Sequence, residues 1–400
     1  MATFREFALR ASSLRALEAT HIVHPTAVQT AAIPPLLQGR DVIGQACTGS
    51  GKTLAFGLPL VESIDERSRA LQALVLAPTR ELAQQVGGVL KQITAGTGIR
   101  LVVLYGGQAI GLQQEALRLG CQIAVGTPGR ILDHLARGSL RLGAVRYLVL
   151  DEADEMLDRG FAPDVERIIA ATATERQTSL FSATTPEWVQ KVAAQYLRTP
   201  LVIQMGLDAD DAPSIEHEVC EVWHDDKFTV LLGLLDLKTE GATLVFGRTK
   251  HGVRKLGERL GRLGYPVDVL QGNLTQNERD RVIKRFREGS TPILVATNVA
   301  ARGLDVLHIG RVINYELPET HELFTHRVGR TGRMGRAGRA ITLLGPADLP
   351  KWHEIEKGLG RKLPRVTPKG EAIPPVTASV AARTSGARRR FNRRRLVARR

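Results

Sequence analysis

Short apolar runs alternate with longer stretches of helical periodicity along most of the chain. In the first half these runs cover 73–76, 101–104, 123–125, 147–150 and 179–181, and each is followed by polar residues. This alternation predicts repeated β-α units that build a parallel sheet with helices on its faces. Because ligands of open α/β sheets bind beyond the carboxyl ends of the strands, we expect functional side chains where the runs end.

The pattern is interrupted once and then restarts. Gly206, three aspartates and Pro213 break up the apolar pattern near 205–214, and further apolar runs follow at 244–246, 267–270, 293–296, 312–315 and 341–344. A chain of 400 residues also exceeds what one hydrophobic core usually organises. The sequence therefore predicts an α/β protein with two tandem domains, residues 1–206 and 215–349, joined by a linker at 207–214. Residues 350–400, with a brief helical stretch near 352–357, are expected to form a largely disordered basic tail.

The formal net charge of +14 is concentrated at the C-terminal end, because residues 372–400 contain nine arginines and no acidic residue. A block of this kind favours contact with polyanions, above all nucleic acid, while the alternative is a solvated extension that aids solubility. If the tail tethers RNA, we expect deletion of residues 383–400 to weaken RNA binding and flatten its salt dependence.

Cysteine usage and the missing export signals indicate a reducing compartment. Cys47, Cys121 and Cys220 are too few and too scattered for a disulfide framework or a zinc site, and no apolar run of about 18 residues occurs. We therefore expect a cytoplasmic protein that does not span a membrane.

A glycine-rich segment, Ala46-Cys-Thr-Gly-Ser-Gly-Lys-Thr53, follows the apolar pair Val42-Ile43. Its glycines allow backbone amides to surround phosphate oxygens, its lysine supplies a positive charge, and its last threonine offers a hydroxyl to Mg²⁺. Ala46 stands where the strict phosphate-loop pattern has glycine, and by itself the segment also fits a structural turn. The candidate nucleotide-binding residues are Thr48, Gly49, Ser50, Gly51, Lys52 and Thr53.

Two neighbouring carboxylates follow the apolar run at 147–150. Asp151 is placed to hold Mg²⁺, and Glu152 to orient or deprotonate an attacking water, as nucleotide hydrolysis requires. Alone, the pair also fits two acids that begin a helix.

With these segments placed, the chain resembles the DEAD-box family of ATP-dependent RNA helicases from about Phe4 to about Leu344. The resemblance implies two RecA-like domains, ATP and Mg²⁺ as ligands, and RNA bound mainly through its backbone. It also implies that Phe4 and Gln29 belong to the adenine-reading segment. His21-Ile22 departs from the family's usual Gly-aromatic pair.

Further segments match the family's RNA-contacting and coupling motifs. The resemblance implies coupling roles for Asp154, Ser182, Thr184 and His326, although a serine or threonine at a strand end also fits a helix cap. Gln271 stands where a histidine is common, and Asn298 replaces the usual aspartate. The implied RNA contacts are Pro78, Thr79, Arg80, Gly107, Thr127, Pro128, Gly129, Arg130, Arg248, Thr249, Gln276, Arg279 and Thr297.

The second domain also carries residues implied to meet ATP. Gly303 and Asp305 would lie at the ribose, and Arg330 and Arg333 match the arginine-finger motif, which stabilises charge on the transferred phosphoryl group. A basic RNA patch without a catalytic role is the alternative for these arginines. If they are fingers, hydrolysis requires the two domains to close.

The preferred hypothesis is an ATP-dependent RNA helicase that opens short duplexes or remodels RNA-protein particles. Three alternatives stay open: a related DNA helicase, an ATP-gated RNA clamp without productive unwinding, and an ATPase that remodels proteins. Ribosomal or other RNA-protein partners are expected, whereas the sequence identifies neither the physiological RNA nor the oligomeric state.

Overall fold

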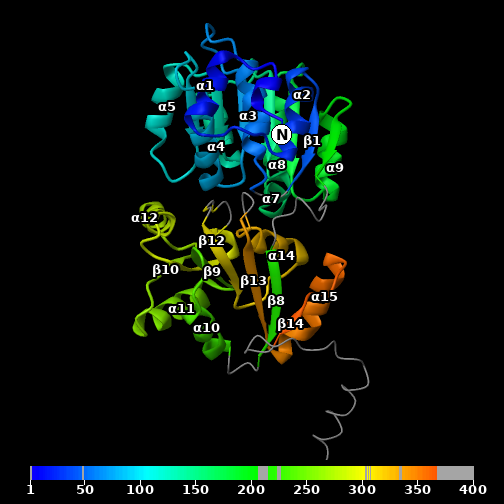
Figure 1. Cartoon of the computed structure of the whole chain (residues 1–400). Coiled ribbons are helices and arrows are strands. Elements are labelled where there is room, and N and C mark those ends of the chain that lie inside the picture. The colour runs from blue at the N-terminus through cyan, green and yellow to red at the C-terminus, as the bar shows by residue number, and fades with distance from the viewer. Residues whose placement is uncertain are drawn as a thin grey trace, which may run out of the picture.

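The computed structural model describes residues 2–46, 49–205, 215–222, 227–301, 304, 306, 308–332 and 336–366. These residues form two seven-stranded sheets in separate lobes, shown one above the other in Figure 1. Every strand pairing is parallel, as predicted. In spatial order the first sheet contains β3 (Leu101–Leu104), β4 (Ile123–Gly126), β2 (Ala73–Leu76), β5 (Tyr147–Asp151), β6 (Gln177–Ser182), β1 (Val42–Gln45) and β7 (Leu201–Gln204).

The second sheet repeats the strand order of the first. Its first strand along the chain, β8, lies second from one edge, as β1 does in the first sheet. The two domains are therefore two copies of one topology. In the matching spatial order the second sheet contains β10 (Val267–Leu270), β11 (Ile293–Thr297), β9 (Ala242–Gly247), β12 (Ile309–Asn314), β13 (Gly338–Leu344), β8 (Ile215–Glu221) and β14 (Arg365–Val366).

Helices cover both faces of the first sheet. Alternate side chains of a strand point to opposite faces, so Ala73 and Val75 join one apolar cluster while Leu74 and Leu76 join the other. The helices over the first cluster are η1 (Phe4–Glu6), α1 (Ala11–Ala19), α2 (Ala27–Leu37), α3 (Lys52–Glu62) and α4 (Arg80–Ile93). Those over the second are α5 (Ile110–Arg118), α6 (Pro128–Ala136), α7 (Ala153–Asp158), α8 (Ala162–Ala171) and α9 (Glu187–Tyr196).

The second domain is longer than the sequence indicated. Trp352 is completely buried, with its ring centroid 5.5 Å from that of Phe324, and β14 pairs with β8. The second domain therefore extends beyond the expected boundary at Leu349. The sequence did not indicate this, because one buried tryptophan and a two-residue edge strand leave little periodic signal. The linker at 207–214 and the tail from 367 lie outside the described residues. The helices here are α10 (Lys227–Asp236), α11 (Lys250–Arg262), α12 (Gln276–Arg287), α13 (Asn298–Ala301), α14 (His321–Val328), η3 (Pro346–Asp348) and α15 (Leu349–Leu359).

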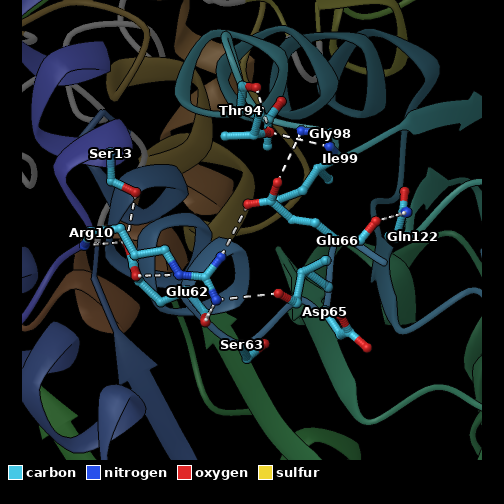
Figure 2. A network of polar contacts seen from close by, with 12 residues as sticks. Arg10, Ser13, Glu62, Ser63, Asp65, Glu66, Thr94, Gly98, Ile99 and Gln122 are labelled. Carbon is cyan, nitrogen blue, oxygen red and sulfur yellow. Dashed lines mark hydrogen bonds and ion pairs between the residues drawn. The ribbon is translucent and has the colours of Figure 1, made fainter. Parts of the chain in front are cut away.

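A polar network anchors the N-terminal helix to the first domain. The Glu62 carboxylate, at the end of α3, accepts hydrogen bonds from Arg10 N at 3.0 Å and from Ser13 Oγ at 2.6 Å (Figure 2). Glu62 thereby places negative charge at the N-terminus of α1, where it stabilises the helix. Nearby, Glu66 accepts a hydrogen bond from Gly98 N at 3.0 Å.

Among the described residues, no helix has the length and apolar character needed to cross a bilayer.

Candidate functional site

The glycine-rich loop joins β1 to α3. Gly49 and Gly51 have φ angles of 85° and 94°, in the left-handed region that favours glycine. Lys52 is the first residue of α3, is buried, and donates a hydrogen bond through Nζ to the Ala46 carbonyl at 2.9 Å. Thr53 is half-buried in the first turn, while Thr48 lies outside the described residues. Backbone amides at a helix N-terminus beside a lysine are suited to bind phosphate.

Helix α2 supports this loop from behind. Thr26 Oγ1 donates to Ser50 O at 2.8 Å, and Gln29 Nε2 donates to Gly51 O at 3.0 Å. Gln29, which the resemblance assigned to adenine, is buried. Its side chain is also hydrogen-bonded to the glycine-rich loop. Phe4 packs in the first apolar cluster with 3% exposure, so its ring anchors the N-terminal segment in the core.

The two acidic residues at the end of β5 have different environments. Asp151 is the last residue of the strand, and burial raises the pKa of its carboxyl to about 7, although Lys52 opposes this shift. Its Oδ1 has no hydrogen-bond partner among the described residues. Glu152 follows with a φ of 51°, a left-handed conformation that is uncommon outside glycine. Such strain occurs often at functional positions.

Asp154 connects the acidic segment to β6. Its Oδ2 accepts hydrogen bonds from Thr184 N at 2.8 Å and Thr184 Oγ1 at 2.9 Å, and its own N donates to Ser182 Oγ at 3.2 Å. Burial alone would raise the pKa of Asp154, but the neighbouring His326 and the Thr184 amide hold it below its ordinary value. The three coupling candidates of the first domain therefore form one bonded group.

The residues of the first domain that are expected to contact RNA lie together at the carboxyl ends of adjacent strands. Pro78 and Thr79 follow β2, Gly107 follows β3, and the segment 127–130 follows β4, in the spatial order β3-β4-β2. Thr79 caps α4 by accepting from Leu82 N at 3.0 Å, and Thr127, Pro128 and Gly129 begin α6. The Arg80 guanidinium lies directly on the glycine loop, because a Cβ added at Gly107 would clash with its NH1.

The RNA candidates of the second domain divide into two groups. Arg248 is exposed, Thr249 caps α11, and Thr297 ends β11. Gln276 and Arg279, in the first turn of α12, instead contact the first domain. Arg80 NH1 donates to Gln276 Oε1 at 2.8 Å, and Arg279 Nε lies 2.5 Å from Glu81 Oε1.

Helix α14 faces α7 across the domain boundary (Figure 1). His326 Nε2 lies 3.9 Å from Asp154 Oδ2. Arg330 is buried and donates through NH1 to Leu304 O at 3.2 Å and through Nε to His326 O at 3.2 Å. Three further candidates, Gly303, Asp305 and Arg333, lie outside the described residues.

The sequence assigned no role to Arg327, which the structure buries beside these residues. Its guanidinium donates to Asn298 Oδ1 at 2.5 Å, to Asn314 Oδ1 at 3.1 Å and to Glu316 O at 2.6 Å. Burial lowers the pKa of Arg327 to about 9. Asn298, the departure noted in the sequence, is therefore a neutral partner of a buried cation. The signal that could have found Arg327 was its place within the arginine motif.

Comparison with known proteins decides the family. Residues 26–192 match the DEAD/DEAH box helicase family, and residues 226–335 match the helicase conserved C-terminal domain. The chain is 44% identical over 368 residues to the DEAD-box ATP-dependent RNA helicase CshA of Geobacillus kaustophilus, covering 92% of this chain and 79% of that protein. This chain belongs to the DEAD-box family of ATP-dependent RNA helicases.

Solved DEAD-box structures agree with this assignment and identify both domains as RecA-like. S. cerevisiae Dbp5 bound to RNA and ADP BeF3 superposes with a TM-score of 0.84 at 32% identity, covering 92% of this chain and 96% of that one. A DEAD box protein from Methanococcus jannaschii, at 38% identity and with 91% and 99% coverage, has a TM-score of 0.56.

Proposed function

We propose that this chain hydrolyses ATP in response to RNA and that closure of its two domains separates short RNA duplexes locally. The observation that carries the proposal is the set of contacts across the domain boundary. His326 faces Asp154, Gln276 accepts from Arg80, and Arg279 pairs with Glu81. The first contact joins two coupling candidates, and the other two place the RNA candidates Gln276 and Arg279 against the start of α4, so RNA and ATP would favour the same closed arrangement.

The domain arrangement offers independent support. The Methanococcus protein is more similar in sequence than Dbp5, yet its TM-score is lower at nearly equal coverage. The lower TM-score of the Methanococcus protein is better explained by a different placement of its two domains than by a different fold. The closed arrangement described here thus resembles that of a protein bound to RNA and ADP BeF3.

The proposed hydrolytic chemistry uses charges from both domains. Lys52 and the loop amides would bind the phosphates, Glu152 would orient and deprotonate the water, and Arg330 would stabilise charge that develops on the transferred phosphoryl group. Mg²⁺ fits the donors present, because the buried Asp151 Oδ1 has no partner among the described residues and Thr53 lies in the adjoining helix turn. When bound, the ion would neutralise charge on the phosphate oxygens.

Reciprocal binding tests this proposal. If both ligands favour closure, RNA tightens the binding of an ATP analogue by the same factor as the analogue tightens RNA binding. The measurement is a titration of each ligand with and without the other, using single-stranded RNA and a matched DNA. Equal affinities in the two conditions would contradict closure, and equal stimulation by DNA would favour the DNA-helicase alternative.

The setting that we propose is the cytoplasm, with structured ribosomal or other RNA-protein particles as substrates. Burial raises the pKa of the Cys121 and Cys220 thiols to about 11 each, which keeps both thiols protonated and unreactive. ATPase rates against a panel of structured RNAs, including ribosomal fragments, would identify the preferred substrate.

A further inference from the structure

Gln113 and His134 lie beneath the RNA-facing loops of the first domain without belonging to any of them. Gln113 is on α5, His134 is on α6, and their exposed fractions are 3% and 0%. The segment 105–108 precedes α5 and the segment 127–130 begins α6. The two side chains are therefore placed between two strand ends that we assign to RNA.

All hydrogen-bonding positions of the Gln113 amide are used. Its Oε1 accepts from Arg130 NH1 at 2.9 Å and lies 3.0 Å from His134 Nε2. Its Nε2 donates to Tyr105 O at 3.0 Å and to Gln108 Oε1 at 3.0 Å. A primary amide has two acceptor positions and two donor hydrogens, so this buried group is saturated. Rotation by 180° would turn its NH2 group toward Arg130, and the amide therefore has one permitted orientation.

His134 fixes that orientation from the other side. For Gln113 Oε1 to accept from the imidazole, Nε2 must carry a hydrogen, and Nδ1, 2.9 Å from Ser139 Oγ, is then free to accept. Burial and, after it, the Arg130 charge lower the pKa of His134, which favours this neutral ring. Gln113 thus receives two hydrogens at its oxygen and can offer both of its own to the loop.

The network reaches the RNA candidates of three strand ends. Arg130 NH1 and NH2 also donate to Gln108 O at 3.3 Å each. The Arg130 guanidinium therefore contacts the loop directly, through Gln108, as well as through Gln113. Gly107, within the same loop, lies against the Arg80 guanidinium. The buried amide of Gln113 is therefore hydrogen-bonded directly to Arg130 and is linked to Arg80 through the 105–108 loop.

We propose that Gln113, with His134 behind it, is a positioning residue that sets Arg130 and the 105–108 loop in the geometry that binds the RNA backbone. The inference rests on the proposed RNA-dependent function. It assigns the work of orientation to two residues outside the RNA motifs, acting on RNA only through the groups they hold.

The test is Gln113→Met in the full-length chain, which keeps a similar volume and removes all four hydrogen bonds. We expect the RNA concentration for half-maximal ATPase to rise about tenfold, the effect of a lost buried hydrogen-bond network of about 1.4 kcal/mol. Turnover at saturating RNA should stay within about twofold of wild type, because the residue acts on binding geometry.

Gln122→Met is the matched control. Gln122 is also a buried glutamine of the first domain, with 4% exposure, and accepts from Arg100 N at 2.8 Å and donates to Ser68 O at 2.6 Å. It precedes the first residue of β4, at the opposite end of the strand from the RNA loops, in the network of Figure 2. We expect a comparable loss of thermal stability and an unchanged RNA concentration for half-maximal ATPase.

Gln113→Glu separates the two halves of the network and covers the case in which the methionine variant does not fold. Its carboxylate can accept from Arg130 and His134 but cannot donate to Tyr105 O, so a rise of about threefold is expected. A wild-type RNA requirement in the folded Gln113 variants, or an equal rise in Gln122→Met, would overturn the proposal. A wild-type protein whose ATPase ignores RNA would instead refute the proposed function, before any variant is compared.

Discussion

The two domains share one strand order but use equivalent positions for different chemistry. Where β1 leads into α3, Lys52 lies at the end of a glycine loop with its Nζ on a backbone carbonyl. Where β8 leads toward α10, Lys227 is the first residue of the helix, and its Nζ lies 2.6 Å from Asp348 Oδ2. Among the described residues, the first lysine donates its hydrogen bond to a neutral carbonyl and acts on Asp151 only through its charge, while the second is paired directly with a carboxylate of its own domain.

The strands that carry the acids differ in the same way. β5 ends on Asp151, whereas β12, in the same place of the strand order, ends on Asn314. Asn314 donates to Thr342 Oγ1 and accepts from Arg327. One topology thus supports a charged site in the first domain and a neutralised copy in the second. In the proposed site, the second domain contributes His326 from α14 and Arg330 just beyond that helix, so the proposed site is complete only when the two domains meet.

The largest difference between the domains is expected from alanine variants of the two lysines. We expect Lys52→Ala to lower RNA-stimulated ATP turnover on the order of 10³-fold, because a positive charge on the phosphates is lost. Lys227→Ala should leave turnover within about twofold and lower the free energy of unfolding by roughly 1–2 kcal/mol, since it leaves Asp348 without its lysine. Steady-state ATPase assays and urea unfolding measure the two effects. Equal losses of turnover would show that the second lysine is also functional.

Asp151→Asn gives the first domain the side chain type that ends β12. Because the folded pKa of Asp151 is raised to about 7 from 3.8, the folded chain binds more protons than the unfolded chain between these values. Stability from this group therefore falls as pH rises from about 4 to 7. The variant should match wild type near pH 4 and exceed it at pH 8 by up to about 4 kcal/mol. Urea unfolding without nucleotide measures this, and a difference independent of pH would contradict it.

Asn298→Asp gives the second domain a carboxylate where it now has a neutral amide. The carboxylate would supply a charged partner to the buried Arg327, whose pKa burial lowers to about 9. We expect the second domain to gain roughly 1–2 kcal/mol, because a buried cation costs least when it is paired and hydrogen-bonded. Chemical unfolding of the full chain gives the value. A loss of stability would mean that Asn298 and Asn314 already satisfy the guanidinium.

The smallest expected effect concerns helix ends. Helix α15 of the second domain is followed by Gly360 with a φ of 67°, while α1 of the first is followed, after Thr20, by His21 with a φ of 58°. His21 N bonds to Glu18 O and Ile22 N to Leu17 O, the pattern in which glycine is favoured. We expect His21→Gly to stabilise the first domain by about 0.5–1 kcal/mol, since a left-handed β-carbon is removed. Thermal unfolding tests this, and a lower midpoint would show that the imidazole contributes contacts.

Much of this fold was predictable because buried parallel strands produce continuous apolar runs. The run at 73–76 coincides with β2, and the run at 267–270 coincides with β10. Three strands at the β1/β8 side of the two sheets were missed: β7 has exposed positions, β8 alternates with glutamates, and β14 has two residues. Their pairing depends on neighbours that a local pattern does not contain.

The site was predictable where a residue type is tied to a motif and less so where contacts cross the molecule. Lys52 and Asp151 follow from strand ends and spacing. The ion pair of Arg279 with Glu81 depends on how the two domains meet, and the proposed role of Gln113 depends on a loop and a helix that fold over it. Neither relation is visible in a window of neighbouring residues.

The place of β14 determines when the protein can mature during synthesis. β8, the first strand of the second domain, is flanked by β13 and β14, the last two strands of the described residues to be made. The second sheet therefore cannot be completed until about residue 366 has left the ribosome, whereas the first sheet is complete once β7 has emerged. Because domains fold as units in the order of synthesis, the nascent chain passes through a period with one finished domain and one open sheet edge. A truncation before β14 would leave β8 as an edge strand, and an unpaired strand edge favours aggregation.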